Sequence, residues 1–206
     1  MPIYELVTLT LRSGTVRNPA RFAEVQASIT AFIGGATLGC FLAEFGPQNR
    51  VTMLREFESI EAVFAERQRV LRHAEPFVPA ALLTGMNFET FVQFPGLPPI
   101  RPGAHGPYYE FRTYVMKTGG LAPTIAAWQG AIPGRAKLSP LITVMHSLDG
   151  EPRFVHVWGY RDLAQREAIR AEAFASGVWP APGAPCWLTE NLKTELFTPT
   201  AISRLC

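Results

Sequence analysis

The chain has 206 residues with a formal net charge of +2, and 48% of the residues are hydrophobic. Such a composition is typical of a folded globular protein and excludes a disordered chain. No basic block suggests a nucleic-acid partner, and no run approaches the roughly 18 apolar residues of a membrane-spanning helix.

Three cysteines are scattered through the sequence, at Cys40, Cys186 and Cys206. An odd and unpatterned set of thiols favours a reducing compartment over a disulfide framework. The first residues show neither a secretory signal nor an Arg-rich presequence. We therefore expect a cytoplasmic protein.

The first half alternates strand and helix patterns. Asn18-Pro19 and Ser59 are typical of helix starts, and turns rich in Gly and Pro separate the elements. The second predicted helix carries Arg67 on an otherwise apolar stripe. The predicted elements are a strand over 3–12, a helix from Asn18-Pro19 to about Ile33, a hairpin of strands over 37–45 and 50–57, a helix after Ser59 and a strand over 84–94.

The second half repeats this order after a connector, residues 96–107, that is dense in Pro and Gly. Asp162 is a candidate helix cap, and the stripe that follows includes Leu163 and Phe174. The order is βαββαβ in both halves, which is typical of ferredoxin-like folds. The predicted elements are a strand over 108–117, a helix over about Pro123–Ile132, a hairpin over about 139–160, a helix from Asp162 and a strand over about 186–197.

The two halves share sequence as well as element order. Tyr4-Glu5-Leu6 returns as Tyr109-Glu110-Phe111, at an offset of 105 residues. Self-similarity at half-length indicates two copies of one unit. We therefore predict an α+β protein with two ferredoxin-like units in tandem, residues 1–95 and 108–206, joined by the connector.

The predicted strands are apolar at most positions rather than alternating. Tyr109 and Phe111 occupy one parity of a strand, and Tyr114 and Met116 occupy the other. Both faces of each sheet are therefore expected to be buried. Because the helices cover only one face, we expect the other faces of the antiparallel sheets to pack face to face, as a dimeric-type α/β barrel around a central cavity.

Two segments of the second half resemble the NIPSNAP family. They are Tyr109-Glu110-Phe111-Arg112-Thr113-Tyr114 and the run from Phe154 through Trp158-Gly159-Tyr160-Arg161-Asp162 to Trp179-Pro180, with a fainter match through Tyr4-Glu5-Leu6. The resemblance implies ferredoxin-like units that pair into a dimeric α/β barrel. It implies no particular activity, because bacterial members have none established; the animal members are mitochondrial and linked to vesicle or mitophagy roles.

The halves differ at polar positions. His156, Trp158 and Tyr160 stand where the first half has Met53, Arg55 and Phe57, and Arg112 and Tyr114 stand where it has Val7 and Leu9. We therefore expect any chemistry to lie in the second unit, with the first as a packing partner.

His156, Trp158 and Tyr160 alternate along one strand and so share a face. If that face lines the cavity, His156 is a candidate general acid or base, Tyr160 a second catalytic candidate and Trp158 a wall of the cavity. The alternative is a half-polar face whose polar atoms are satisfied internally.

Arg112 shares its strand face with Glu110 and Tyr114. An arginine in the middle of a strand needs an anionic partner, so one hypothesis is a carboxylate ligand bound by Arg112, with Glu110 and Tyr114 beside it. The alternative is an internal ion pair between Arg112 and Glu110.

His146 is a further candidate ligand-binding residue on the neighbouring strand. A two-residue turn at Asp149-Gly150, the default for Asp-Gly, places His146 and His156 on opposite faces, whereas a three- or five-residue loop places them on the same face. A two-histidine metal site is disfavoured, and no third ligand stands at a recognisable spacing.

Two functions remain open. The first is a protein that binds a small anionic or aromatic molecule, and that could act as a cofactor-independent isomerase, lyase or monooxygenase. The second is a non-catalytic scaffold or interaction module. No nucleotide, flavin or structural-zinc motif is present, so we expect no cofactor, although haem stays open. The apolar content makes a homodimer plausible.

Overall fold

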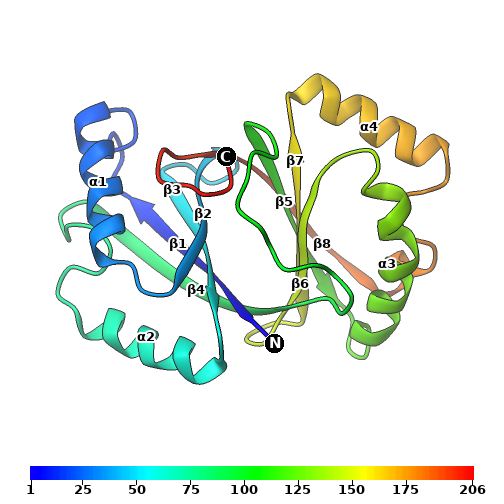
Figure 1. Cartoon of the computed structure of the whole chain (residues 1–206), viewed down its shortest axis with the longest axis horizontal. Helices are drawn as coiled ribbons and strands as arrows, with labels where there is room; N and C mark the ends of the chain where they lie inside the picture. The colour runs from blue at the N-terminus through cyan, green and yellow to red at the C-terminus, as the bar shows by residue number, and fades with distance from the viewer. The chain divides into compact units, whose positions relative to one another are not determined.

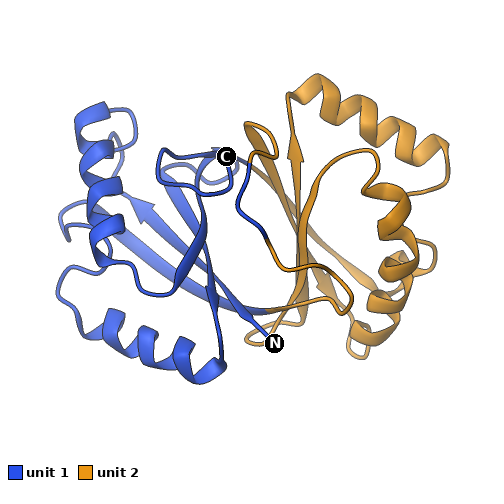
Figure 2. Cartoon of the chain, viewed as in Figure 1, with its two compact units in different colours: residues 1–91, 101–103, 197–206 blue, residues 92–100, 104–196 orange.

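A computed structural model describes all 206 residues of the chain. The chain divides into two compact units (Figure 2). Unit 1 comprises residues 1–91, 101–103 and 197–206, and unit 2 comprises residues 92–100 and 104–196. The division departs from the predicted one at the C-terminal end, because residues 197–206 belong to unit 1. There, Thr200 N donates to Cys40 O (2.9 Å) and Cys40 N donates to Ser203 Oγ (3.1 Å).

Unit 1 has the predicted βαββαβ order, seen in the blue-to-green part of Figure 1. Its elements are β1 (Ile3–Leu11), α1 (Pro19–Phe32), β2 (Ala36–Phe45), β3 (Arg50–Phe57), α2 (Ile60–Arg72) and β4 (Leu83–Gln93). The strands are ordered β4-β1-β3-β2, with β1 antiparallel to β3 and β2 antiparallel to β3. This is the sheet order that two βαβ crossovers produce in a ferredoxin-like unit.

The helix starts in unit 1 follow from their capping residues. The side chain of Asn18 accepts from Arg21 N before Pro19, and the side chain of Ser59 accepts from Ala62 N. Each supplies an acceptor to one of the backbone N–H groups that the first helical turn leaves unpaired. Both predicted caps are confirmed.

The helices of unit 1 cover the face of the sheet that carries the odd-numbered residues of β1 and β3. The core there joins Val7 and Leu9 of β1 with Met53 of β3, Val25 of α1 and Val70 of α2. Burial of such aliphatic side chains supplies most of the stability of a unit of this size.

Unit 2 repeats the architecture. Its elements are β5 (Tyr108–Met116), α3 (Leu121–Arg135), β6 (Leu141–Ser147), β7 (Arg153–Tyr160), α4 (Leu163–Ala175), a 3₁₀ turn η1 (Ala184–Trp187) and β8 (Leu188–Pro199), in the order β8-β5-β7-β6. Asp162 caps α4 by accepting from Gln165 N, as predicted. The two βαββαβ units and the α+β class are confirmed. None of the helices is long and apolar enough to span a membrane.

The candidate site residues lie on the face of the unit 2 sheet that the helices cover. Arg112 lies opposite His156 in the β5–β7 register, and Glu110 lies opposite Trp158. This same face packs against Trp128 of α3. The prediction that they would line a cavity on the other face of the sheet is therefore wrong. Both faces are apolar, so hydrophobic periodicity could not decide which one the helices cover.

The β6–β7 connection places His146 and His156 on the same face. The strands end at Ser147 and resume at Arg153, which leaves a five-residue loop, and His146 pairs with Phe154 while Val144 pairs with His156. The default prediction of opposite faces is wrong because the Asp-Gly pair lies inside this longer loop. Arg153 closes the loop, donating to Asp149 O at 2.8 Å.

Helix α4 turns a different side to the sheet than its apolar stripe predicted. Leu163 is 45% exposed and Phe174 is 75% exposed, whereas the buried residues of the helix are Ile169 and Ala173. Arg166 and Arg170 occupy the same helical side as that buried pair. The inner side of α4 is therefore partly charged, which is why a search for apolar periodicity missed it.

Candidate ligand-binding site

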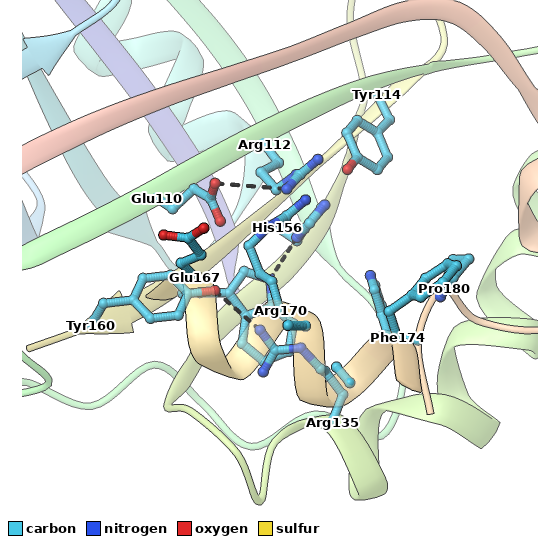
Figure 3. Close-up of a pocket in the computed structure, with 14 residues that line it drawn as sticks. Glu110, Arg112, Tyr114, Arg135, His156, Tyr160, Glu167, Arg170, Phe174 and Pro180 are labelled. Atoms are coloured by element: carbon cyan, nitrogen blue, oxygen red, sulfur yellow. Dashed lines mark hydrogen bonds and ion pairs between the residues drawn. The ribbon is translucent and has the colours of Figure 1, made fainter. Parts of the chain in front are cut away.

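Unit 2 contains a cavity of about 510 Å³ between the sheet and its two helices (Figure 3). It includes every residue predicted as part of the site except His146. Side chains of β5 and β7 form one wall and side chains of α4 form another, with Arg135 reaching in from α3. The lining residues are Glu110, Arg112, Tyr114, Arg135, His156, Trp158, Tyr160, Glu167, Arg170, Ala171, Ala173, Phe174, Trp179 and Pro180.

His156 is a buried titratable residue of this cavity, with 1% of its surface exposed. Trp158 Nε1 donates to His156 Nδ1 at 2.7 Å, while His156 Nε2 is buried without a hydrogen-bond partner. Because Nδ1 accepts, the neutral ring carries its proton on Nε2. His156 therefore presents a hydrogen-bond donor that nothing in the protein accepts.

Burial lowers the pKa of His156 well below 6.5, and the positive charges of Arg112, Arg135 and Arg170 lower it further. The imidazole is thus neutral at physiological pH. A general base would have to receive a proton in this cationic surrounding, at an atom that already carries one. The arrangement suits a donor to a ligand oxygen rather than the predicted proton acceptor.

Aromatic rings surround His156 on several sides. The ring centroid of His156 lies 4.7 Å from that of Trp128, 5.0 Å from Tyr114 and 6.4 Å from Trp179. Trp179 also contacts Trp158, with centroids 6.1 Å apart. These rings exclude water from the imidazole and give the cavity an apolar wall.

Glu110 is held at one oxygen only. Its Oε1 accepts from Arg166 Nε at 3.0 Å and lies 3.6 Å from Arg112 Nη1, a distance that marks a loose ion pair. Its Oε2 is buried without a partner, and so is Arg112 Nε. The internal pair between Arg112 and Glu110, one of the two alternatives, is therefore present, but it leaves both groups with unused hydrogen-bonding capacity.

Two further arginines face the cavity without a carboxylate of their own. Arg135 is 3% exposed; it donates to Ser139 Oγ at 2.7 Å and to Tyr160 Oη at 3.0 Å, and its guanidinium carbon lies 4.2 Å from the Trp158 ring centroid. Arg170 lines the cavity at its exposed rim and makes no ion pair. Partial desolvation, followed by the charge of Arg112, lowers the pKa of Arg170.

Tyr160 and Tyr114 are both neutral phenols in this setting. Burial raises the pKa of each hydroxyl above 10.0, against a lowering effect of Arg135 at Tyr160 and of Arg112 at Tyr114. Tyr160 accepts a hydrogen bond from Arg135, so it positions that guanidinium. This contact offers no support for the predicted catalytic role of Tyr160.

Sequence reasoning missed Arg135, Arg166 and Arg170. Arg170 carried a usable signal, because it aligns at an offset of 103 residues with Arg67, which already stood out on the apolar stripe of the first half. Arg135 carried none, since the helix was expected to end near Ile132 whereas α3 continues to Arg135.

His146 does not contribute to the cavity. It lies on β6, partly buried and outside the cavity. Its ring centroid lies 6.3 Å from that of Phe94, and its Nδ1 lies 3.3 Å from Ser147 O. Phe154 separates it from His156 along the face. No group of three His, Cys, Asp or Glu side chains gathers as a metal site requires.

The fold and the cavity define a protein of two ferredoxin-like units whose second unit holds a cationic, aromatic-walled pocket. The model of the NIPSNAP family matches residues 4–85 and 109–204, one segment for each half of the sequence. The chain belongs to the NIPSNAP family.

Curated relatives agree with this assignment. The chain is 26% identical over 183 residues to a NipSnap homolog of Dictyostelium discoideum, covering 86% of this chain and 78% of that protein. It is 27% identical over 150 residues to NipSnap homolog 2 of mouse, covering 69% of this chain but only 53% of the mouse protein. A nematode NipSnap protein from Caenorhabditis elegans is covered over 20% of its length.

A crystal structure of an anthrone oxidase-like protein is similar over 97% of this chain and 91% of its own, with a TM-score of 0.65 and 12% sequence identity. Likeness at this identity shows a shared fold over the full chain and carries nothing about activity.

Proposed function

We propose that unit 2 binds a small organic anion that carries an aromatic ring. The observation that carries the proposal is the surplus of buried and rim cations over carboxylates: Arg112, Arg135 and Arg170 line the cavity with Glu110 and Glu167, and Glu110 is already engaged by Arg166. A buried cation without a counter-charge is costly, so a ligand carboxylate would relieve the imbalance.

The aromatic part of the ligand follows from the other walls. Trp158, Trp179 and Phe174 present ring surface to the same cavity. An aryl group against them would bury apolar area and make edge-to-face contacts, while the carboxylate meets the guanidinium groups. His156 Nε2–H would donate to a ligand oxygen.

The proposal concerns binding rather than catalysis. His156 is neutral with its proton already on Nε2, and Tyr160 is a phenol that accepts from Arg135, so neither supports the acid–base pair that the sequence suggested. The cofactor-independent reactions considered from the sequence would need another base.

Isothermal titration with phenylacetate and benzoate tests the proposal, with thermal melting as a second readout. We expect binding in the micromolar-to-millimolar range and about tenfold weaker affinity in Arg170→Gln. Arg67→Gln, the aligned position in unit 1, is the matched control and should leave the affinity unchanged. A flat titration with both acids would overturn the proposal and favour the scaffold alternative.

A further inference from the structure

We infer that the anion bound by unit 2 carries a hydroxyl group next to its carboxylate, and that Glu110 is the residue that selects it. The ligand class is an aryl 2-hydroxycarboxylate. This inference rests on the proposed function, but it depends on a different set of atoms and fails separately from it.

The first observation behind the inference is the free oxygen of Glu110. The side chain is 1% exposed, and Arg166 and Arg112 both approach Oε1, which leaves Oε2 buried, unpartnered and part of a residue that lines the cavity. A carboxylate oxygen can only accept hydrogen bonds. The ligand therefore needs a donor at this position, because a buried acceptor without one is costly.

The second observation is a pair of hydrogen-bond donors beside that acceptor. Arg112 Nε and His156 Nε2 are also buried without partners. Arg112 lies directly opposite His156 across the β5–β7 pair and two residues from Glu110 on the same strand face. Figure 3 shows the side chains of Glu110, Arg112 and His156 near one another. One acceptor next to two donors is the complement of a group that both donates and accepts within a short span.

A plain carboxylate fits only half of this pattern. Its oxygens would satisfy Arg112 Nε and His156 Nε2, but they would leave Glu110 Oε2 unpaired and close to like charge. A hydroxyl on the adjacent carbon supplies the missing donor. The hydroxyl would donate a hydrogen bond to Glu110 Oε2, while the ligand carboxylate would accept from Arg112 Nε and His156 Nε2.

An ammonium group could also donate to Glu110, but the charges of the cavity argue against it. Arg112, Arg135 and Arg170 line the same space, and Arg166 lies on the other oxygen of Glu110. A cationic group on the ligand would be repelled by four guanidinium groups and attracted by one carboxylate oxygen. A neutral hydroxyl donor avoids this repulsion, so 2-hydroxy acids fit better than 2-amino acids.

A matched ligand series tests the inference on the wild-type chain by isothermal titration. The ligands are phenylacetate, each enantiomer of mandelate, and α-methoxyphenylacetate, which keeps the oxygen but has no proton to donate. We expect one mandelate enantiomer to bind at least about tenfold tighter than phenylacetate, since hydrogen bonds to charged groups are among the stronger ones. The methoxy compound should bind no better than phenylacetate.

Glu110→Gln then assigns the selectivity to its residue. Arg166 would hold the amide oxygen and leave the amide N–H₂ facing the cavity, where it cannot accept. The mandelate preference should shrink to about twofold or less, while phenylacetate still binds, which also shows that the variant is folded. Glu110→Asp, which keeps the charge but withdraws the oxygen, should lose the preference as well, and it serves if the first variant does not fold.

The outcomes separate the two proposals. Equal affinity for mandelate and phenylacetate in the wild type would overturn the hydroxyl inference and leave the anion site standing. A preference that survives in Glu110→Gln would overturn the role of Glu110. No binding of any acid would overturn the proposed function itself.

Discussion

The two units hold the same glutamate in opposite ways. In unit 1, Glu5 pairs with Arg55 at one oxygen and with Arg67 at the other (2.6 Å), and Arg55 also reaches Glu66 at 2.9 Å. In unit 2, the aligned Glu110 keeps one oxygen free. We call the network of unit 1 closed, because both oxygens of its glutamate are paired, and the network of unit 2 open, because one oxygen is free.

Two exchanges and one retained arginine, all at an offset of 103 residues, produce this difference. Trp158 stands where unit 1 has Arg55, and Arg166 stands where it has Val63, whereas Arg67 is retained as Arg170. Arg166 takes the carboxylate that Arg67 takes in unit 1, and Arg170 is left without a partner. The same fold therefore holds a glutamate with both oxygens paired in unit 1, and a glutamate with a free oxygen beside an unpaired arginine in unit 2.

The largest effect is expected from breaking the closed network. Glu5→Ala leaves Arg55 buried beside a lost partner, and removing one member of a buried pair costs about 3–5 kcal/mol of unfolding free energy. Glu110→Ala should cost about 1–2 kcal/mol, because Arg166 and Arg112 are 27% and 15% exposed and can turn to water. Urea denaturation of both variants measures the gap, and equal losses would contradict the comparison.

A second change should convert unit 2 toward unit 1. Arg166→Val restores the residue of unit 1 and frees Glu110 to pair with Arg170, as Glu5 pairs with Arg67. We expect phenylacetate affinity to fall about tenfold, with unfolding free energy changed by less than about 1 kcal/mol. Arg161→Ala, an exposed arginine before α4, is the control that should leave binding intact. Unchanged affinity in Arg166→Val would show that Arg170 is not the free cation we describe.

The pH dependence of stability should come from unit 2 between about pH 6.5 and pH 5. Burial depresses the pKa of His156, so in this range the unfolded chain binds a proton that the folded chain does not, and stability falls as the pH falls. The slope approaches about 1.4 kcal/mol per pH unit. His156→Asn, whose side-chain oxygen can accept from Trp158, should flatten it, and a slope that persists in this variant would contradict its origin at His156.

The smallest effect is a difference in thiol reactivity that leaves stability unchanged. Burial raises the pKa of Cys40 in unit 1 to about 11, whereas Cys186 and Cys206 are exposed. Under native conditions a chromogenic disulfide reagent should modify the two exposed thiols quickly and Cys40 only after denaturation. Rapid modification of all three would show that unit 1 opens more readily than its closed network implies.

Sequence reasoning reached the fold because local chemistry and the repeat agree. Asn18, Ser59 and Asp162 each cap the helix they were expected to cap, and the halves have the same element order. It also selected Arg112 and His156, because they differ from Val7 and Met53 at the aligned positions, and Glu110, because it shares a strand face with Arg112.

Sequence reasoning could not determine which face of each sheet the helices cover. The strands are apolar on both parities, so the face that meets the helices is decided by packing between elements distant in sequence. The relation of His146 to His156 depended on whether the β6–β7 loop has two or five residues. The arginines of α4 were hidden because the side of that helix facing the sheet is not its most apolar side.

The rings around His156 also give the chain a built-in optical label. All four tryptophans, Trp128, Trp158, Trp179 and Trp187, lie in unit 2, and unit 1 has none. Indole emission therefore reports on one half of the chain alone, and Trp158 reports from the wall of the cavity, between His156 and Arg135. Ligand entry and the melting of unit 2 can be followed by fluorescence without attached dyes, while the far-ultraviolet circular dichroism signal follows both units together.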